Sequence, residues 1–376
     1  MHKHMKKNII VNLIKPTINE IAKYVPGESK IAGAKNVIKL SSNESPFSIP
    51  KKVYSSAKKL IEESNLYPDG DSTLLKYAIS KNFKIKKSQI ICGNGSDDIL
   101  SLITQAFARE HSEVICSEYG FIYYPIISKV AGAKVIIAKS KNLAVSCENI
   151  LKKISKKTRI IFIANPNNPT GSIIMRNELK KFLQKVPKNI IVVIDGAYSE
   201  FVTDNSYSNG FDLIDKFQNL IITRTFSKIF ALAGLRLGWA YSSKQIIETL
   251  EKVRGPFNVN LLAQKIGSLI LQEKSFLKKS ILHNTFWQNK LTKFINSLGL
   301  EAKTTYANFV LIEISKEKFK KEVILKLLLE NKILIRDLDS YGLKQFIRVS
   351  IGSNEQMNKF MKTLENIMSK NAVKRN

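Results

Sequence analysis

The stretch TRTFSKIFALAGLRLGWAY, residues 223–241, decides how the rest of this chain is interpreted. The run NLIIT at residues 219–223 leads into it, is rich in β-branched residues and predicts a strand. Lys228 therefore follows a strand and has apolar neighbours. Because burial disfavours the charged form of a lysine and lowers its pKa, Lys228 is a candidate nucleophile. Taken alone, the same pattern fits an ordinary solvated lysine on a loop equally well.

The length of 376 residues allows a large domain with a smaller one, or a single large α/β unit. No apolar run approaches the ~20 residues that would span a bilayer. The basic N-terminus lacks the cleavage pattern of a signal peptide, so we expect a cytoplasmic protein without membrane contact. Cys92, Cys116 and Cys147 have no disulfide or metal spacing, and we expect buried free thiols and no metal site.

The formal net charge of +29 raises the question of nucleic-acid binding. The lysines are spread along the whole chain, however, without interleaved aromatic residues and without a helix-turn-helix or zinc-finger pattern. We therefore expect no nucleic-acid partner. The excess positive charge would still favour the approach of anionic small-molecule substrates.

From residue 89 to residue 223 apolar runs alternate with helical patterns. Continuous apolar strands separated by helices predict a mostly parallel sheet covered by helices on both faces. Ligands of such sheets bind at the carboxyl ends of the strands. Tyr119, Asn168, Asp195, Tyr198 and Lys228 all fall at such ends. The expected strands are 113–116, 134–138, 159–164, 189–194 and 219–223, and the expected helices are 51–63, 73–81, 122–131, 148–153 and 176–184.

After about residue 245 the pattern changes. A long helical stretch at 261–297 precedes short apolar runs at 309–314, 333–336 and 345–350. Helices are expected at 318–329 and, after the last apolar run, to about residue 370. This predicts a smaller α+β domain. We expect it to include the strand that begins at residue 37, so that residues 1–50 form an arm and part of the small domain, 51–265 the large domain and 266–376 the small domain. A short helix should end near Tyr24, Pro26 and Gly27.

The sequence GNGSDD at residues 93–98 links an apolar run to a helical pattern. Backbone N–H groups of Gly95, Ser96 and Asp97 at a helix N-terminus would form an anion site suited to phosphate. A plain N-cap by Ser96 or Asn94 explains this turn equally well in isolation.

Two further stretches add chemistry. NPNNPTG at residues 165–171 is a rigid turn that contains Asn168, and IDGAYSEF at 194–201 places Asp195 at the end of a strongly apolar strand. A buried carboxylate is costly without a cation. A protonated pyridine nitrogen is such a cation, and a lysine with an anion site nearby is what pyridoxal 5'-phosphate (PLP) requires.

In combination and in this order, these motifs resemble the class I and II aminotransferases of PLP fold type I. The likeness extends from about residue 20 to the C-terminus. It is closest to members that act on histidinol phosphate, and the stretches that carry it are KLSSNESPF (39–47), YPDG (67–70), RGPFNVN (254–260), ANFV (307–310), ILIRD (333–337) and IRVSIG (347–352). The resemblance implies a homodimer that exchanges an amino group between glutamate or 2-oxoglutarate and histidinol phosphate or imidazole acetol phosphate.

The resemblance also implies a role for each matching residue. Lys228 would bind the cofactor as a Schiff base and move the proton, Asp195 would pair with the pyridine nitrogen, and Asn168 and Tyr198 would bind the ring oxygen. Tyr119 would stack on the ring. Gly95, Ser96, Asp97, Thr225, Ser227 and Arg236 would bind the cofactor phosphate, Tyr67 would reach the site of the neighbouring subunit, and Arg348, Arg336, Tyr24 and Asn43 would contact substrate.

Two departures from the family pattern stand out. Gly196 replaces the usual Glu after the cofactor aspartate, which we expect to affect packing only. Ser117 and Glu118 replace the usual Pro-Thr before Tyr119. Individually, Arg336 and Arg348 could be surface cations, and Tyr67 or Asn168 simple turn residues.

An aromatic-amino-acid aminotransferase is the alternative activity, because a flat imidazole pocket also admits a phenyl ring. A PLP-dependent phospho-amino-acid decarboxylase on the same scaffold is a further alternative.

Overall fold

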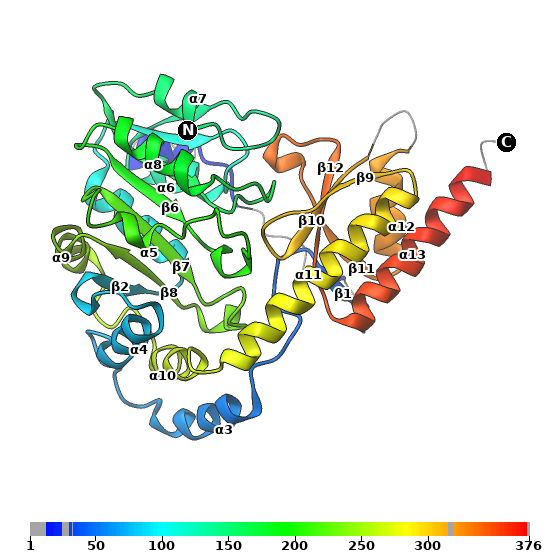
Figure 1. The fold of residues 1–376 in the computed structure, drawn as a ribbon, viewed down its shortest axis with the longest axis horizontal. Helices are drawn as coiled ribbons and strands as arrows, with labels where there is room; N and C mark the ends of the chain where they lie inside the picture. Colours follow the sequence, from blue (N-terminus) through cyan, green and yellow to red (C-terminus); the bar gives the residue numbers. More distant parts are fainter. Residues whose placement is uncertain (1–12, 25–29, 32, 315–318, 374–376) are drawn as a thin grey trace, which may run out of the picture.

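The computed structural model describes residues 13–24, 30–31, 33–314 and 319–373, and places them in two parts, each built on its own sheet (Figure 1). The larger part holds a seven-stranded sheet and the smaller part a five-stranded sheet. The α/β class expected from the sequence is confirmed.

The large sheet has the strand order β2-β8-β7-β6-β5-β3-β4. The pairs among β7, β6, β5, β3 and β4 are parallel, and β8 runs antiparallel to both of its neighbours. Parallel strands point their carboxyl ends toward one edge, so the residues that follow them gather there. The strands are β2 (Ile90–Gly93), β3 (Glu113–Ser117), β4 (Lys134–Ala138), β5 (Thr158–Ala164), β6 (Ile191–Asp195), β7 (Leu220–Thr225) and β8 (Gly238–Ser242).

Both faces of the large sheet are buried, which explains why its central strands are continuous apolar runs. In β5, Ile161 and Ile163 point into one core cluster, whereas Ile160 and Phe162 point into the other. The first cluster is covered by α3 (Lys51–Leu60), α4 (Thr73–Phe83), α7 (Cys147–Lys152), α8 (Arg176–Lys185) and α10 (Leu261–Ile270). The second is covered by α5 (Ser96–Phe107), α6 (Tyr123–Val130) and α9 (Lys244–Val253).

The small sheet joins the two ends of the chain. Its order is β1-β11-β12-β10-β9, and β1 pairs in parallel with β11. A single core cluster lies between this sheet and its long helices. The elements are β1 (Ile38–Leu40), β9 (Glu301–Lys303), β10 (Phe309–Glu313), β11 (Ile333–Asp337), β12 (Phe346–Ser350), α11 (Lys274–Ser297), α12 (Lys321–Glu330) and α13 (Asn354–Val373). The domain boundaries at residues 50 and 265 stay a prediction.

The helical stretch expected at 261–297 is divided into two helices. The chain forms α10 and α11 with a turn at residues 271–273. The break has a physical reason, because Ile266 of α10 packs in the core of the large sheet and Leu291 of α11 in that of the small sheet. The strands β8 and β9 and the helix α9 were not expected. Near the N-terminus the structure has the short helix α2 (Pro16–Asn19), and the expected residues Pro26 and Gly27 lie outside the described part.

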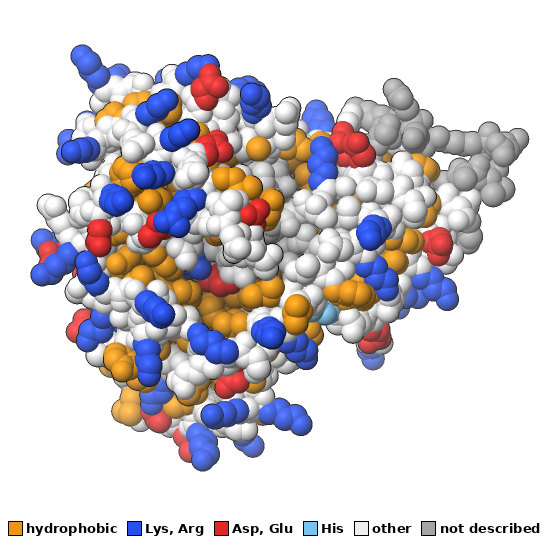
Figure 2. All heavy atoms as spheres, in the orientation of Figure 1, with side chains coloured by type: hydrophobic (Ala, Val, Ile, Leu, Met, Phe, Trp, Pro, Cys, Tyr) orange, Lys and Arg blue, Asp and Glu red, His pale blue; other side chains and the backbone are white. Residues whose placement is uncertain are grey.

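The three cysteines are buried and free, as expected. Burial raises the pKa of Cys92 and of Cys147 to about 12, so neither is a reactive thiolate. In the described part of the chain there is no His, Cys, Asp and Glu cluster of metal-binding size and no helix long and apolar enough to cross a bilayer. Figure 2 shows Lys and Arg side chains scattered over the visible face.

Candidate active site

A cavity of about 470 Å³ opens where β5, β6 and β7 end, and residues of both sheets line it. Most of the predicted site residues meet here, although they come from distant parts of the sequence. Those that line the cavity are Tyr24, Asn43, Ser96, Asp97, Asn168, Asp195, Tyr198, Thr225, Ser227, Lys228, Arg236, Arg336 and Arg348. Gly95, Tyr67 and Tyr119 are not among the lining residues.

Lys228 lies three residues beyond the end of β7 and points into the cavity. Its Nζ donates a hydrogen bond to the backbone oxygen of Ser42, 3.2 Å away, and lies 5.8 Å from the centre of the Tyr198 ring. Burial lowers the pKa of Lys228 to about 8, and the positive charges of Arg348 and Arg236 act in the same direction. A substantial fraction of this amine is therefore neutral, as a nucleophile or proton acceptor requires.

Asp195 is the last residue of β6, and only 6% of it is exposed. Its Oδ2 accepts a hydrogen bond of 2.8 Å from the Tyr124 hydroxyl, and its Oδ1 accepts one of 3.2 Å from the Ala197 backbone N–H. Burial nevertheless raises the pKa of Asp195. A cation held against this carboxylate would favour its ionised form, which is the role expected of a protonated pyridine nitrogen.

The hydroxyl of Tyr198 is fixed from the other side of the cavity. The side-chain amide of Asn43 donates a hydrogen bond of 2.9 Å to it, and the Asn43 Oδ1 accepts one of 2.8 Å from the Ser350 hydroxyl. Asn43 follows β1, Ser350 ends β12, and Tyr198 belongs to the large part. This chain of hydrogen bonds thus joins the two sheets at the site.

One end of the cavity has the donors that an anion needs. The helix α5 begins at Ser96, and the hydroxyls of Thr225 and Ser227 and the guanidinium of Arg236 line the same region. Arg236 donates to the Ser227 Oγ at 3.3 Å and pairs with the Asp97 carboxylate at 2.7 Å. Free N–H groups at a helix start and a guanidinium form a site suited to phosphate.

Gly95 does not line the cavity but shapes this end of it. Its φ is +92°, and a Cβ there would lie 2.1 Å from the Asp97 Oδ1 and 2.5 Å from the Arg236 Nη2. Only glycine leaves room for the ion pair between these two side chains.

The opposite wall carries two arginines. Arg336 on β11 and Arg348 on β12 are directly opposite each other in an antiparallel pair and both line the cavity. Arg348 is 5% exposed, donates to the Asn168 Oδ1 and to the backbone oxygen of Ser41 at 2.8 Å, and has an Nε without a hydrogen-bond partner in the described chain. Burial lowers the pKa of Arg348, and Arg336 adds to this. Like charges placed opposite each other are destabilising, and an anion between them would remove that cost.

Tyr119 does not line the cavity, and its predicted stacking on the cofactor ring stays a prediction. This tyrosine packs beside the apolar cluster of Leu311, Leu338, Tyr341 and Leu343, outside the cavity. Phe121 lines the cavity instead. The turn at residues 118–120, which connects β3 to α6, explains this difference. Tyr119 lies within the turn, and Phe121 follows it.

Sequence reasoning also missed Tyr124 and Tyr341, which line the cavity. Tyr124 is fully buried, and its ring stacks on Phe162 with centroids 4.9 Å apart and a 7° angle between planes. Its position three residues after Phe121, on one side of a helix start, was the available signal.

Tyr67 lies away from the cavity of its own chain. It is 83% exposed and stacks on Phe257, with ring centroids 4.7 Å apart. Its predicted role toward a neighbouring subunit stays a prediction.

Gly196 does not line the cavity and lies beside Ser199 and Arg224. A Cβ at this position would lie 2.5 Å from the Ser199 Oγ and 3.1 Å from the Arg224 Cδ and Nη1, so these two side chains fill the space next to the glycine. Arg224 is buried and pairs with Glu200 at 2.8 Å. The departure from the family pattern is therefore located in the packing behind the site.

Comparison with known proteins identifies the protein family. Residues 35–364 match the model of the family described as aminotransferase class I and II, and the chain belongs to this family.

Among its relatives, the histidinol-phosphate aminotransferase of Pelagibacter ubique (strain HTCC1062) is 39% identical over 93% of this chain and 98% of its own length. That of Maricaulis maris (strain MCS10) is 37% identical over 93% and 97%. The crystal structure of histidinol-phosphate aminotransferase from Sinorhizobium meliloti in complex with pyridoxal-5'-phosphate superimposes with a TM-score of 0.87, at 22% identity, over 95% of this chain and 98% of that one.

Proposed function

We propose that this chain is a PLP-dependent transaminase that interconverts imidazole acetol phosphate plus glutamate and histidinol phosphate plus 2-oxoglutarate in histidine biosynthesis. The observation that carries the proposal is one cavity lined both by Lys228 and Asp195 and by the cross-strand pair Arg336 and Arg348. The names of the relatives at 37–39% identity support the substrate.

The residues of the cavity fit the cofactor. Asp195 would hold the protonated ring nitrogen, Asn168 and Tyr198 the ring oxygen, and Phe121, which lines the cavity, would offer an aromatic face. Ser96, Asp97, Thr225, Ser227 and Arg236, with the turn at Gly95, would hold the phosphate. When bound, PLP supplies an electron-withdrawing ring that makes the Cα proton of an amino acid acidic.

The protein side chains perform the proton transfer and the positioning. Lys228 would hold the cofactor through its Nζ and, once released, would take the Cα proton on that same atom and deliver it to the C4′ carbon, with the reverse transfer in the opposite direction. The pKa of about 8 suits this exchange near neutral pH. Asp195 stays ionised when a cation faces it, and Tyr124 holds its carboxylate in place through the 2.8 Å hydrogen bond.

The two arginines explain how one site serves two substrates. A guanidinium binds a carboxylate or a phosphate bidentately, so Arg348 and Arg336 suit both a dicarboxylate and a phosphate ester. Tyr24 and Asn43, from the N-terminal segment of the chain, also line the cavity and would complete the substrate contacts.

We also propose that the protein works as a homodimer in the cytoplasm. The exposed pair of Tyr67 and Phe257 is accompanied by other large apolar side chains on neighbouring segments, which supports an interface there. These are Tyr54, Ile61, Leu66, Leu74 and Tyr77, each 57–61% exposed. Sedimentation velocity should give a dimer, and Tyr67→Ala should retain the fold but lower the activity.

Spectroscopic titration tests the function. Purified protein loaded with PLP should lose its cofactor absorbance band on addition of histidinol phosphate at much lower concentration than on addition of phenylalanine, and 2-oxoglutarate should restore the band. If phenylalanine is equally effective, the substrate is an aromatic amino acid and the histidinol phosphate assignment is wrong.

A further inference from the structure

Two surface loops, residues 66–72 and 254–260, meet beside the first turn of α5. The first carries Tyr67 and the second carries Phe257, and these two rings stack on each other. Phe257 has a φ of +54°, which is unfavourable for an aromatic residue and persists only where the surroundings impose it. The contacts around this residue therefore hold the loop in a defined conformation.

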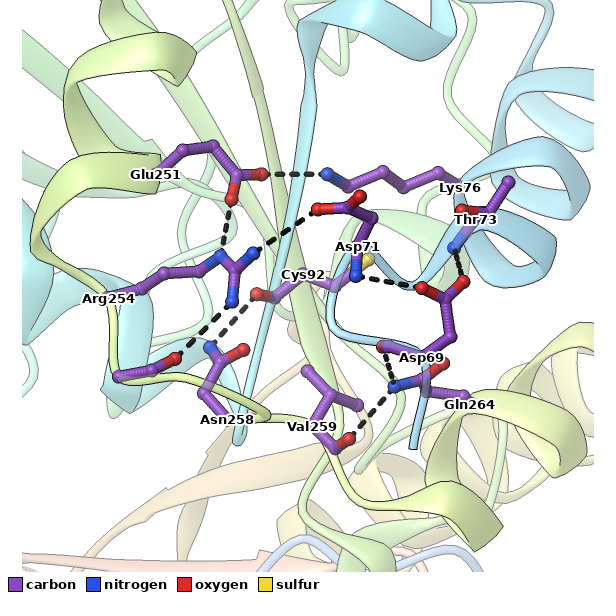
Figure 3. A network of polar contacts seen from close by, with 11 residues as sticks. Asp69, Asp71, Thr73, Lys76, Cys92, Glu251, Arg254, Asn258, Val259 and Gln264 are labelled. Carbon is purple, nitrogen blue, oxygen red and sulfur yellow. Dashed lines mark hydrogen bonds and ion pairs between the residues drawn. The ribbon is translucent and has the colours of Figure 1, made fainter. Parts of the chain in front are cut away.

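A polar network ties the two loops together (Figure 3). Glu251, in the last turns of α9, accepts hydrogen bonds from Lys76 of α4 at 2.7 Å and from Arg254. Arg254 also pairs with Asp71 of the first loop at 3.6 Å, and Gln264 donates to the backbone oxygen of Asp69 at 2.8 Å. Loop 254–260 is thus fixed against the loop that carries Tyr67.

The same network reaches the turn that begins α5. The Asn258 side chain donates to the Asp98 Oδ2 and to the backbone oxygen of Cys92, both at 3.2 Å (Figure 3 draws the second contact). The Asp98 Oδ2 also accepts the backbone N–H of Asn94 at 2.8 Å. Asn258 therefore contacts the last part of β2 and, through Asp98, the turn at residues 93–96.

We propose that Asn258 and Arg254 are positioning residues. Asn258 holds the turn that leads into the start of α5, where the N–H groups of Ser96 and Asp97 would bind the cofactor phosphate, and Arg254 holds Asn258 in place by fixing its loop to the loop of Tyr67. Neither side chain lines the cavity. This inference rests on the proposed PLP site. It predicts that the network acts on binding of the phosphate group and has little effect on binding of the pyridine ring.

Comparison of PLP with pyridoxal, which lacks the phosphate, tests the first part. In protein stripped of cofactor, Asn258→Ala should raise the dissociation constant of PLP about tenfold, the cost of a hydrogen bond to a charged group, and leave that of pyridoxal within about twofold. Asn260→Ala is the matched control. It lies on the same loop, caps α10 through a hydrogen bond from the Ala263 N–H and donates to the Leu235 backbone oxygen at 3.1 Å, but contacts neither Asp98 nor Cys92 through the hydrogen bonds of the described chain. It should therefore lower the melting temperature without the tenfold loss of PLP affinity expected for Asn258→Ala.

Three outcomes are distinguishable. If the unmodified protein binds neither compound, the proposed function fails. If it binds PLP but Asn258→Ala weakens both compounds equally or neither, the positioning role is wrong. Asn258→Leu, which removes the donor at nearly constant size and adds no charge beside Asp98, carries the same test if the alanine variant does not fold.

A double-mutant cycle tests the second part. Arg254→Ala should weaken PLP binding about threefold, and because both residues act through one loop, the double variant should be little worse than Asn258→Ala alone. If the losses of PLP affinity in the two single variants multiply in the double variant, Arg254 does not act through Asn258, and the inference is overturned.

Discussion

The lowered pKa of Lys228 predicts how fast the stripped protein captures PLP at different pH values. Covalent capture requires the neutral amine. Burial lowers the pKa of this lysine from its ordinary value of 10.5 to about 8, and Arg348 contributes to the same shift. The capture rate should therefore rise with pH, reach half of its maximum near pH 8 and level off at higher pH.

The expected magnitude follows from the two pKa values. At pH 7.5 a group with a pKa near 8 is neutral in roughly a quarter of the molecules, whereas a lysine with its ordinary pKa is neutral in roughly one of a thousand. Capture at pH 7.5 should then be on the order of 200-fold faster than for an amine of ordinary pKa and equal nucleophilicity.

Stopped-flow absorbance after mixing with PLP measures this rate, with Nα-acetyllysine as the reference amine. Arg348→Met should move the midpoint to higher pH, because it removes the largest electrostatic cause of the shift. A midpoint near 10 in the unmodified protein, or no movement in the variant, would refute the reasoning from burial and charge.

Five further variants test the site and the core. Asp195→Asn should still capture PLP covalently but lower kcat at least about 100-fold, since an amide cannot stabilise a protonated ring nitrogen; steady-state kinetics measure this. Tyr124→Phe should lower kcat about tenfold by removing one hydrogen bond to that carboxylate, with an unchanged urea midpoint as the check on folding. Phe121→Leu should weaken PLP binding severalfold in a fluorescence titration, whereas Tyr119→Leu should not. Phe182→Ala, in the buried core, should cost about 3–5 kcal/mol of unfolding free energy, and a loss under 1 kcal/mol would contradict the packing.

Much of the site was predictable because parallel strands bring residues that follow them to one edge. Asn168 follows β5, Asp195 ends β6 and Lys228 follows β7. Locating these parallel strands in the sequence is therefore sufficient to predict that the three residues lie close together. The buried core was equally predictable from the sequence, because the apolar runs of these strands are long and unbroken.

The sequence was least informative at residues 119–124, where the local path of the backbone decides which side chains line the cavity. Four aromatic residues lie within this stretch, and pattern alone does not say which of them faces the cavity. The choice depends on where the turn after β3 ends and where α6 begins, at Tyr123. A shift of two residues along the chain separates Tyr119, packed outside, from Phe121 at the wall.

The sequence placed the first strand in the small domain but not its partner in the sheet, and this pairing completes the site. β1 pairs with β11 across nearly the whole chain, Ile38 opposite Ile333. This pairing places Ser41 where it accepts a hydrogen bond from Arg348 and Ser42 where it accepts one from Lys228. The backbone of one short segment thus contacts both the proposed substrate arginine and the proposed cofactor lysine. A displacement of the small sheet would therefore alter both at once, so substrate binding and the environment of the lysine amine are coupled through the residues after β1.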